Sequence, residues 1–522
     1  MRAASLGAIL VLIVAVSAAG ESLAERAFAH PRPDGAPKAS DVIMRSLRAH
    51  PAGQSDPHDT LKALGDFHVT RLEWAYITDP GFISKVHEMG CVFGGAVSAP
   101  SYLPANKEDD WFEQVVIVDL EGNPIIAPWK RTWNRTLWGC INNPELERGY
   151  VEYLKKCVDA GVDVMQRDEP EANLGATHWG GCFCDHCMAG FRDWLAAHTS
   201  PEQRAQLGID DVAAFDYRTH LRGQSAPVGD AFRKWDGGEL KKLFVQFQTD
   251  ATVAFHERTR AAMNAYAGRA VPMSCNNGGR HWGPVHLGFD WAFGELSYGH
   301  ATPMTLNLSM GAARKFDRVQ VVTMPKSSQW QTLPDFERRA RCTIAMAYAL
   351  GGHCMVPWDT YMPGDTPRYF GTPEQYADLF GFIRATAEFL DGYELTALAG
   401  ANIEGIGGDV ALPVNVPRDS EWYAVVRAVP RQVERPAVIH LVNWADAPAP
   451  GTIVLDRERF FSGVSRVTLI TPKPYNAEAH AAAFDTGDYA PLVERTSLEV
   501  DDAGGVAVPA LSPWGLLVVA PS

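Results

Sequence analysis

The stretch ELERGYVEYLKKCVDAGVDVMQRD, residues 145–168, decides the fold class of this chain. Residues 145–161 are helix-like, and they lead into a short apolar run rich in β-formers, 162–168. A helix that feeds directly into such a strand is the repeating unit of parallel α/β folds. The stretch therefore predicts a βαβ architecture, which further units along the chain must support.

The same alternation recurs from residue 40 to about 395, with further helix-like segments at 59–67, 80–90 and 338–352. Eight apolar runs are predicted strands: DVIMRSL (41–47), VTRLEWAYI (69–77), CVFGGAVS (91–98), VDVMQRD (162–168), AVPMSCN (270–276), FDWAFGEL (289–296), RVQVVTM (318–324) and HCMVPWD (353–359). Eight strands with intervening helices and long insertions predict a (β/α)8 TIM barrel over residues 40–395. An open doubly wound sheet is the alternative, but the Gly-rich turn that usually follows its first strand is missing here.

The two ends of the chain differ from this middle part in composition and sequence pattern. Residues 396–522 contain short strand-like runs separated by Pro, Gly and Asp turns, with no helical period, which predicts a C-terminal β-sandwich. At the other end, Arg2, an apolar stretch and Ser17-Ala18-Ala19 predict a signal peptide over residues 1–19, and residues 20–39 read as a flexible lead-in. We therefore expect export, and no later segment is apolar enough for membrane insertion.

Composition excludes some partners. The net charge of −15 argues against a nucleic-acid partner, which would need a basic stripe on the surface. No phosphate-binding glycine motif occurs, so we expect no organic cofactor. The remaining classes include enzymes and binding proteins that act on small or polymeric polar ligands.

Catalytic side chains of a (β/α)8 barrel project from the carboxyl ends of its strands. The polar and aromatic residues that end the predicted strands are Glu73, Trp74, Ser98, Asp168, Glu169, Asn276, Asn277, Glu295, Trp358 and Asp359. Carboxylates, amides and tryptophans together are typical of glycosidic bond cleavage, in which one acid protonates the leaving oxygen and another attacks the anomeric carbon or activates water. We expect Glu169, Glu295, Asp168 and Asp359 to be catalytic. Substrate contacts are expected from Trp74, Asn276, Trp282, Trp358 and Asp290.

Cysteines 182, 184 and 187 form a C-x-C-x-x-C cluster. They are too close in sequence to pair comfortably with one another, whereas thiolates on a turn suit a tetrahedral Zn²⁺. The fourth ligand is expected from Cys140, His186 or His178. Disulfides that involve Cys140 are the alternative, because an exported protein meets oxidising conditions.

The run from Val92 to Leu195 resembles the family 42 glycoside hydrolases, the β-galactosidases. The shared pieces are SAPSYLP (98–104), VVIVDLEGNP (115–124), a cysteine before Asn-Pro at Cys140, and CFCDHCMAGFRDWL (182–195). The resemblance implies Glu169 as the acid/base and Cys140, Cys182, Cys184 and Cys187 as ligands of a structural zinc. It also implies a homo-oligomer, because members of that family are often trimers.

The chain departs from that family in two places. The family's nucleophile is a Glu at the end of the seventh strand, where this chain has TMPKSSQW (323–330), and Asp168 replaces an Asn that contacts the sugar. Glu295, followed by Asp359 and Asp290, is the expected replacement for the missing nucleophile, and the separation of the fourth and sixth strands favours inverting geometry. The sequence predicts an exported glycoside hydrolase acting on an oligo- or polysaccharide. The alternatives are a non-catalytic carbohydrate-binding relative and a zinc-dependent hydrolase.

Overall fold

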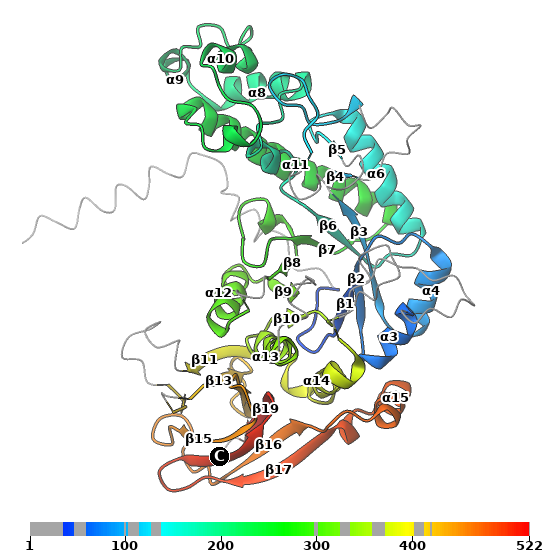
Figure 1. Cartoon of the computed structure of the whole chain (residues 1–522), viewed down its shortest axis with the longest axis vertical. Coiled ribbons are helices and arrows are strands. Elements are labelled where there is room, and N and C mark those ends of the chain that lie inside the picture. The colour runs from blue at the N-terminus through cyan, green and yellow to red at the C-terminus, as the bar shows by residue number, and fades with distance from the viewer. Residues whose placement is uncertain are drawn as a thin grey trace, which may run out of the picture.

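The computed structural model describes residues 35–45, 59–98, 101–102, 114–126, 137–296, 301–323, 335–357, 371–400, 412–417 and 420–520. The predicted signal peptide and most of the predicted lead-in lie outside these residues. Figure 1 shows three regions along the long axis: a helical lobe at the top, a barrel in the middle and β-sheets at the bottom.

Eight parallel strands form one sheet in the order β1-β2-β3-β6-β7-β8-β9-β10. Their bounds are β1 Ile43–Arg45, β2 Arg71–Ala75, β3 Val92–Ser98, β6 Val164–Asp168, β7 Met273–Asn276, β8 Trp291–Glu295, β9 Val319–Thr323 and β10 His353–Cys354. Beyond β10, the backbone N–H of Val356 donates to the carbonyl of Ile43 in β1, so the two edges meet. The nearly closed barrel confirms the predicted fold class, and each predicted strand contains one of these eight.

Helices cover the outside of the barrel (Figure 1). They are α3 Thr60–Asp66, α4 Pro80–Glu88, α6 Pro144–Asp159, α11 Gly238–Ala267, α12 Pro303–Arg314, α13 Phe336–Ala349 and α14 Pro373–Ala385. Several begin at an Asp, Asn or Thr followed by proline, and in α6 the side chain of Asn143 accepts a hydrogen bond from the Glu145 N–H. Such a cap satisfies an otherwise free donor, and proline already has the helical φ angle.

Between β6 and β7 the chain builds a helical lobe that the sequence did not predict as a separate unit. It contains α7 Ala172–Thr177, α8 Asp185–His198, α9 Pro201–Gln206, α10 Tyr217–Gly223 and the first part of α11. The lobe has its own apolar core, in which Phe183 stacks on Phe244 and Phe191 packs edge-on against Phe244. The cysteine cluster lies in this lobe.

After the barrel, two antiparallel sheets follow, as predicted. One has the order β11-β13-β14-β19-β16-β17 and the other β12-β15-β18. Their bounds are β11 Glu394–Gly400, β12 Val414–Asn415, β13 Trp422–Ala428, β14 Ala437–Asn443, β15 Ala449–Leu455, β16 Arg466–Pro472, β17 Val493–Glu499, β18 Gly505–Leu511 and β19 Trp514–Val519. Side chains from both sheets share one core, for example Ile439 and Ile453. The expectation of no helix in this region was wrong, because α15, Ala477–Thr486, connects β16 to β17.

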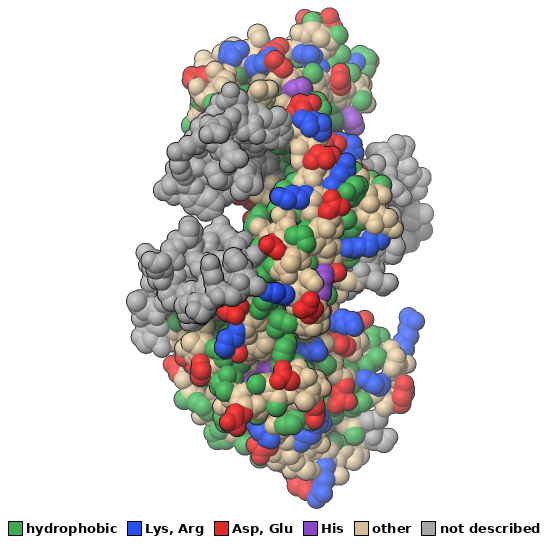
Figure 2. All heavy atoms as spheres, turned by 90° about the vertical axis from the view of Figure 1, so that its right-hand side faces the viewer, with side chains coloured by type: hydrophobic (Ala, Val, Ile, Leu, Met, Phe, Trp, Pro, Cys, Tyr) green, Lys and Arg blue, Asp and Glu red, His purple; other side chains and the backbone are tan. Residues whose placement is uncertain are grey.

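Positive and negative side chains are mixed on the surface of the molecule. On the face in Figure 2, Lys and Arg side chains lie interspersed with Asp and Glu, without a large patch of one sign. Among the described helices, none combines the length and the apolar composition that a membrane span requires.

Candidate active site and cysteine cluster

Asp168 ends β6 and receives hydrogen bonds from two neighbouring barrel segments. Its Oδ2 accepts from the Tyr76 hydroxyl at 2.8 Å, and its Oδ1 accepts from the Asn276 amide at 3.2 Å. Tyr76 follows β2 and Asn276 ends β7, so these contacts join three segments at the carboxyl ends of the strands. Together the two hydrogen bonds fix the orientation of the Asp168 carboxylate.

Glu169, the next residue, adopts a backbone conformation that non-glycine residues rarely take. Its φ is +51°, and its Oε2 accepts a hydrogen bond of 3.0 Å from the Ser98 hydroxyl at the end of β3. Trp74 near the end of β2 also has a positive φ, +56°. Strained residues of this kind cluster at functional sites, because surrounding contacts must hold them in place. Here they mark the carboxyl ends of β2 and β6.

Glu295 ends β8 with a side chain that is 42% exposed, and the Arg45 guanidinium lies 3.9 Å from its carboxylate. Arg45 ends β1 and stacks over the Trp74 ring at 3.8 Å. Arg45 also acts on Tyr76: burial and the adjacent Asp168 raise the pKa of Tyr76 well above its usual range, while Arg45 opposes this shift. Arg45 therefore influences both Glu295 and the tyrosine that binds Asp168.

Sequence reasoning missed Tyr76 and Arg45, and an irregularity in β2 explains the first of them. Leu72 pairs with Phe93 but Ala75 pairs with Gly95, so β2 contains one extra residue between these pairs. Such a bulge redirects the side chains beyond it. Glu73, expected near the mouth, is instead fully buried, bonded to Arg71 and Trp291, and burial raises its pKa.

Three expected substrate contacts are corrected by the structure. Trp74 and Trp282 are 1% and 8% exposed, so neither presents a free face for a sugar, and the Trp282 indole donates to Gln320. Asp290 precedes β8 at its amino end, about 16 Å along the strand from Glu295. There Asp290 accepts from the Met273 N–H and lies 3.7 Å from Arg260, so it stabilises the barrel rather than the mouth.

Two further expectations lie outside the described residues. Trp358 and Asp359 follow the described part of β10, and 324–330 of the segment TMPKSSQW follow β9. Their roles stay predictions. Asp168, Glu169, Asn276 and Glu295 are thus the expected site residues that the structure places at the carboxyl ends of the strands.

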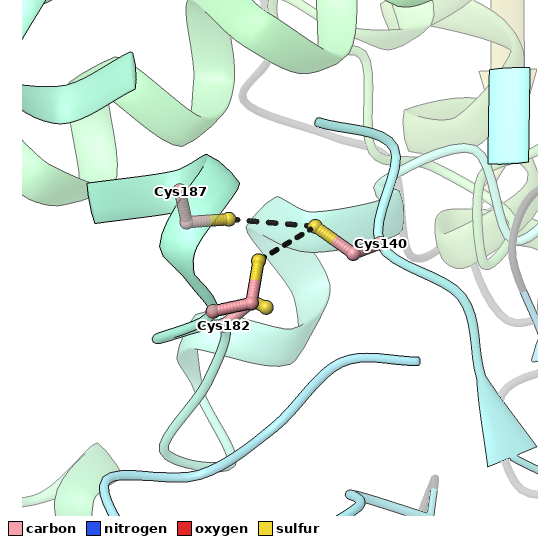
Figure 3. Close-up of side chains that lie close together, drawn as sticks. Cys140, Cys182 and Cys187 are labelled. Carbon is pink, nitrogen blue, oxygen red and sulfur yellow. Dashed lines mark hydrogen bonds between the residues drawn. The ribbon is translucent and has the colours of Figure 1, made fainter. Parts of the chain in front are cut away.

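The four cysteines come together in the helical lobe. The sulfurs of Cys140, Cys182, Cys184 and Cys187 all lie within 4.8 Å of one another. The Cys140 sulfur is 3.6 Å from that of Cys184 and 3.4 Å from that of Cys187. Figure 3 shows the side chains of Cys140, Cys182 and Cys187 pointing toward one another from different segments. All nine cysteines are free thiols in this structure, so the alternative of a disulfide with Cys140 is not formed.

This geometry fits a tetrahedral metal ion. Thiolates bound to Zn²⁺ at about 2.3 Å lie about 3.8 Å apart, close to the distances observed here. Amide groups surround the sulfurs: Asn173 donates to Cys140 and Cys187 at 3.2 and 3.4 Å, and Asn142 donates to Cys187 at 3.3 Å. Donors of this kind stabilise metal-bound thiolates. The fourth member of the cluster is Cys140, and neither His178 nor His186 belongs to it.

Burial gives a second reason for a cation. It raises the pKa of the Cys182 and Cys187 thiols well above the usual range. These thiols therefore become thiolates only where a positive charge compensates them. The donor set therefore suits an ion that binds sulfur.

Sequence comparison relates part of the chain to glycoside hydrolases. Over 274 residues, 48% of its length, it is 26% identical to an alpha-agarase from Alteromonas agarilytica. It is 25% identical over 278 residues to an alpha-agarase from Thalassotalea agarivorans. The chain spans about a fifth of these relatives, 19% and 18% of their lengths.

Among solved structures, alpha-L-fucosidase isoenzyme 2 from Paenibacillus thiaminolyticus matches over 92% of this chain and 99% of its own, with a TM-score of 0.56 and 11% identity. That similarity shows a shared fold. No family model matches the chain. The comparisons give no support to the family 42 resemblance in particular.

Proposed function

We propose that this chain is an exported glycoside hydrolase that cleaves O-glycosidic bonds of a polysaccharide. The observation that carries the proposal is the set of carboxylates at the carboxyl ends of β6 and β8, where TIM-barrel enzymes bind their substrates. Agar is the first polysaccharide to test, because both sequence relatives are alpha-agarases.

In this proposal Glu169 donates the proton to the leaving oxygen and Glu295 is the partner carboxylate. The exposed Glu295 is accessible to substrate, and the Ser98 hydroxyl orients Glu169. Asp168 binds a sugar hydroxyl with the Asn276 amide, while Tyr76 fixes the Asp168 carboxylate. Two carboxyl groups with these roles suffice for hydrolysis.

We further propose that Cys140, Cys182, Cys184 and Cys187 hold a structural Zn²⁺. Four thiolates fill the tetrahedral positions of the ion, so a bound zinc would stabilise the lobe and supply no site for water or substrate. This favours the glycosidase over the zinc-dependent hydrolase, which needs an open position on the metal.

The roles of the acids are tested with Glu169→Gln and Glu295→Gln, assayed on agar and a panel of other polysaccharides by reducing-end release. General acid catalysis contributes about 10²–10⁴-fold, so each variant is expected to lose activity on that scale. Glu458→Gln is the matched control, because Glu458 is exposed in a turn between β15 and β16, outside the barrel. Unchanged turnover in both site variants would overturn the assignment.

Product analysis distinguishes the proposed enzyme from a non-catalytic carbohydrate-binding protein. That alternative predicts glycan binding by the wild-type chain with no new products in chromatography. Product release, lost in Glu169→Gln but kept in Glu458→Gln, excludes it.

A further inference from the structure

We propose that Glu171, His281 and His286 form a second metal site, for a divalent transition-metal ion, next to the strand ends that carry the acids. One ligand atom of each residue lies within 4.8 Å of those of the other two. Glu171 follows the carboxyl end of β6, and both histidines belong to the segment between β7 and β8. The site is separate from the four cysteines.

The burial of His286 is the second observation. The residue is 3% exposed, and its Nδ1 has no hydrogen-bond partner among the described residues. A buried polar atom without a partner is unfavourable, and a bound ligand would offset that cost. The side chains of Glu171 and His281 also make no hydrogen bond within the part of the chain that the structure describes.

Hydrogen bonds to backbone groups anchor two of the three residues. The Glu171 carbonyl accepts from the Thr252 hydroxyl at 3.4 Å, and the His281 N–H donates to the Asn277 carbonyl at 3.3 Å. The two imidazoles meet edge to face, with ring centroids 5.2 Å apart. Ligands about 2.0–2.2 Å from an ion lie about 3–3.5 Å apart, so small side-chain rotations complete the site.

Gly283 provides the space for one of the ligands. A Cβ at this position would lie 2.9 Å from the His281 Nε2, closer than real contacts allow. Any larger residue would displace the imidazole. Gly283→Ala therefore perturbs the site while all three ligands are retained.

The ligand types identify the kind of metal. Two imidazoles and one carboxylate suit Zn²⁺ and similar ions, whereas Ca²⁺ and Mg²⁺ prefer oxygen ligands alone. Three protein ligands leave at least one position on the ion open. Because His281 is exposed and Glu171 half-buried, that position is accessible to water or to a polar ligand at the barrel mouth.

The test counts zinc in the full chain. Wild-type protein is equilibrated with Zn²⁺, dialysed and measured by native mass spectrometry, together with His281→Ala and His198→Ala. His198 is an exposed histidine on α8 and serves as the control. We expect His281→Ala to hold one zinc fewer than the other two proteins. Equal counts in all three would overturn the proposal.

A second measurement uses a variant that retains all three ligand residues. Calorimetric titration of Gly283→Ala with Zn²⁺ is expected to show a dissociation constant for this site raised by at least about tenfold, as for other changes beside metal ligands. If His281→Ala does not fold, Glu171→Gln replaces it, since a half-buried carboxylate tolerates an amide. Unchanged affinity in Gly283→Ala and an unchanged count in Glu171→Gln contradict the site.

Discussion

Asn173→Asp is the substitution that tests the cysteine cluster most directly. The Asn173 amide nitrogen donates to the sulfurs of Cys140 and Cys187, and its Oδ1 accepts from the Ile141 N–H at 3.0 Å. Asp has the same shape and keeps the acceptor. It loses both N–H···S bonds and adds a negative charge beside the sulfurs, which are thiolates in the proposed zinc site.

The expected loss of zinc affinity follows from these contacts. A hydrogen bond to a charged group contributes about 1.5–3 kcal/mol, and Asn173 makes two. Cys187 also receives amide hydrogen bonds from Asn142 and Gln248, whereas Asn173 is the amide donor to Cys140. Changes beside metal ligands weaken binding about 10–100-fold, and the added charge places this one at the upper end. We therefore expect the zinc dissociation constant to rise at least about 100-fold.

Competition with a chromogenic zinc chelator measures that constant, and thermal unfolding with and without chelator reports the stability of the lobe. Asn307→Asp on α12 is the matched control, because Asn307 is far from the cysteines in sequence and belongs to a barrel helix. The wild type and Asn307→Asp should resist the chelator equally. If Asn173→Asp retains zinc as well as they do, the cysteines do not bind the metal as thiolates supported by this amide.

Three further predictions concern the barrel and its contact with the C-terminal region. Tyr76→Phe removes the 2.8 Å hydrogen bond to Asp168, and kcat/KM on a polysaccharide that the wild type hydrolyses should fall about ten- to hundredfold with little change in thermal stability. The His68 and His480 rings share a buried hydrogen bond of 2.7 Å between barrel and α15, and burial lowers the pKa of His68 from 6.5 to about 3. The unfolded chain therefore binds a proton at His68 more readily than the folded chain does. The folded state has its full stability above pH 6.5 and loses part of it as the pH falls toward 3. Thermal unfolding of His68→Gln should therefore depend less on pH than that of the wild type. Gly94→Ala would place a Cβ 2.9 Å from the Glu73 Cγ, and chemical denaturation should show a loss of about 1–3 kcal/mol.

The barrel was predictable because its strands are nearly continuous apolar runs. In β9, Val319 to Val322 are all buried, a pattern that parallel strands covered on both faces produce. The helical lobe was not, because its core depends on contacts such as Phe183 with Phe244, far apart in the sequence. Composition reveals such aromatics without showing which of them meet.

The candidate site was predictable only in part. Asp168, Glu169 and Glu295 follow from the rule that active sites lie at the carboxyl ends of barrel strands. Trp74 was misplaced because the bulge in β2 changes which side chains face the mouth, and a shift of one residue reverses the faces of a strand. Asp290 precedes the strand that Glu295 ends, so strand direction places it at the opposite end of the barrel.

The acids and the cysteines have separate chemistry, yet α7 connects them mechanically. Glu169 directly follows β6, and α7 begins at Ala172. Asn173 on the first turn of α7 contacts both Cys140 and Cys187. The Ala172 N–H donates to the Glu169 carbonyl at 3.2 Å, so a shift of α7 reaches the strained backbone of Glu169 directly. In the proposed enzyme, loss of the proposed zinc would therefore reduce hydrolysis by moving Glu169 rather than by removing a catalytic group. Asn173→Asp should then lower kcat even where the barrel remains folded, whereas a purely structural lobe would leave kcat unchanged until unfolding.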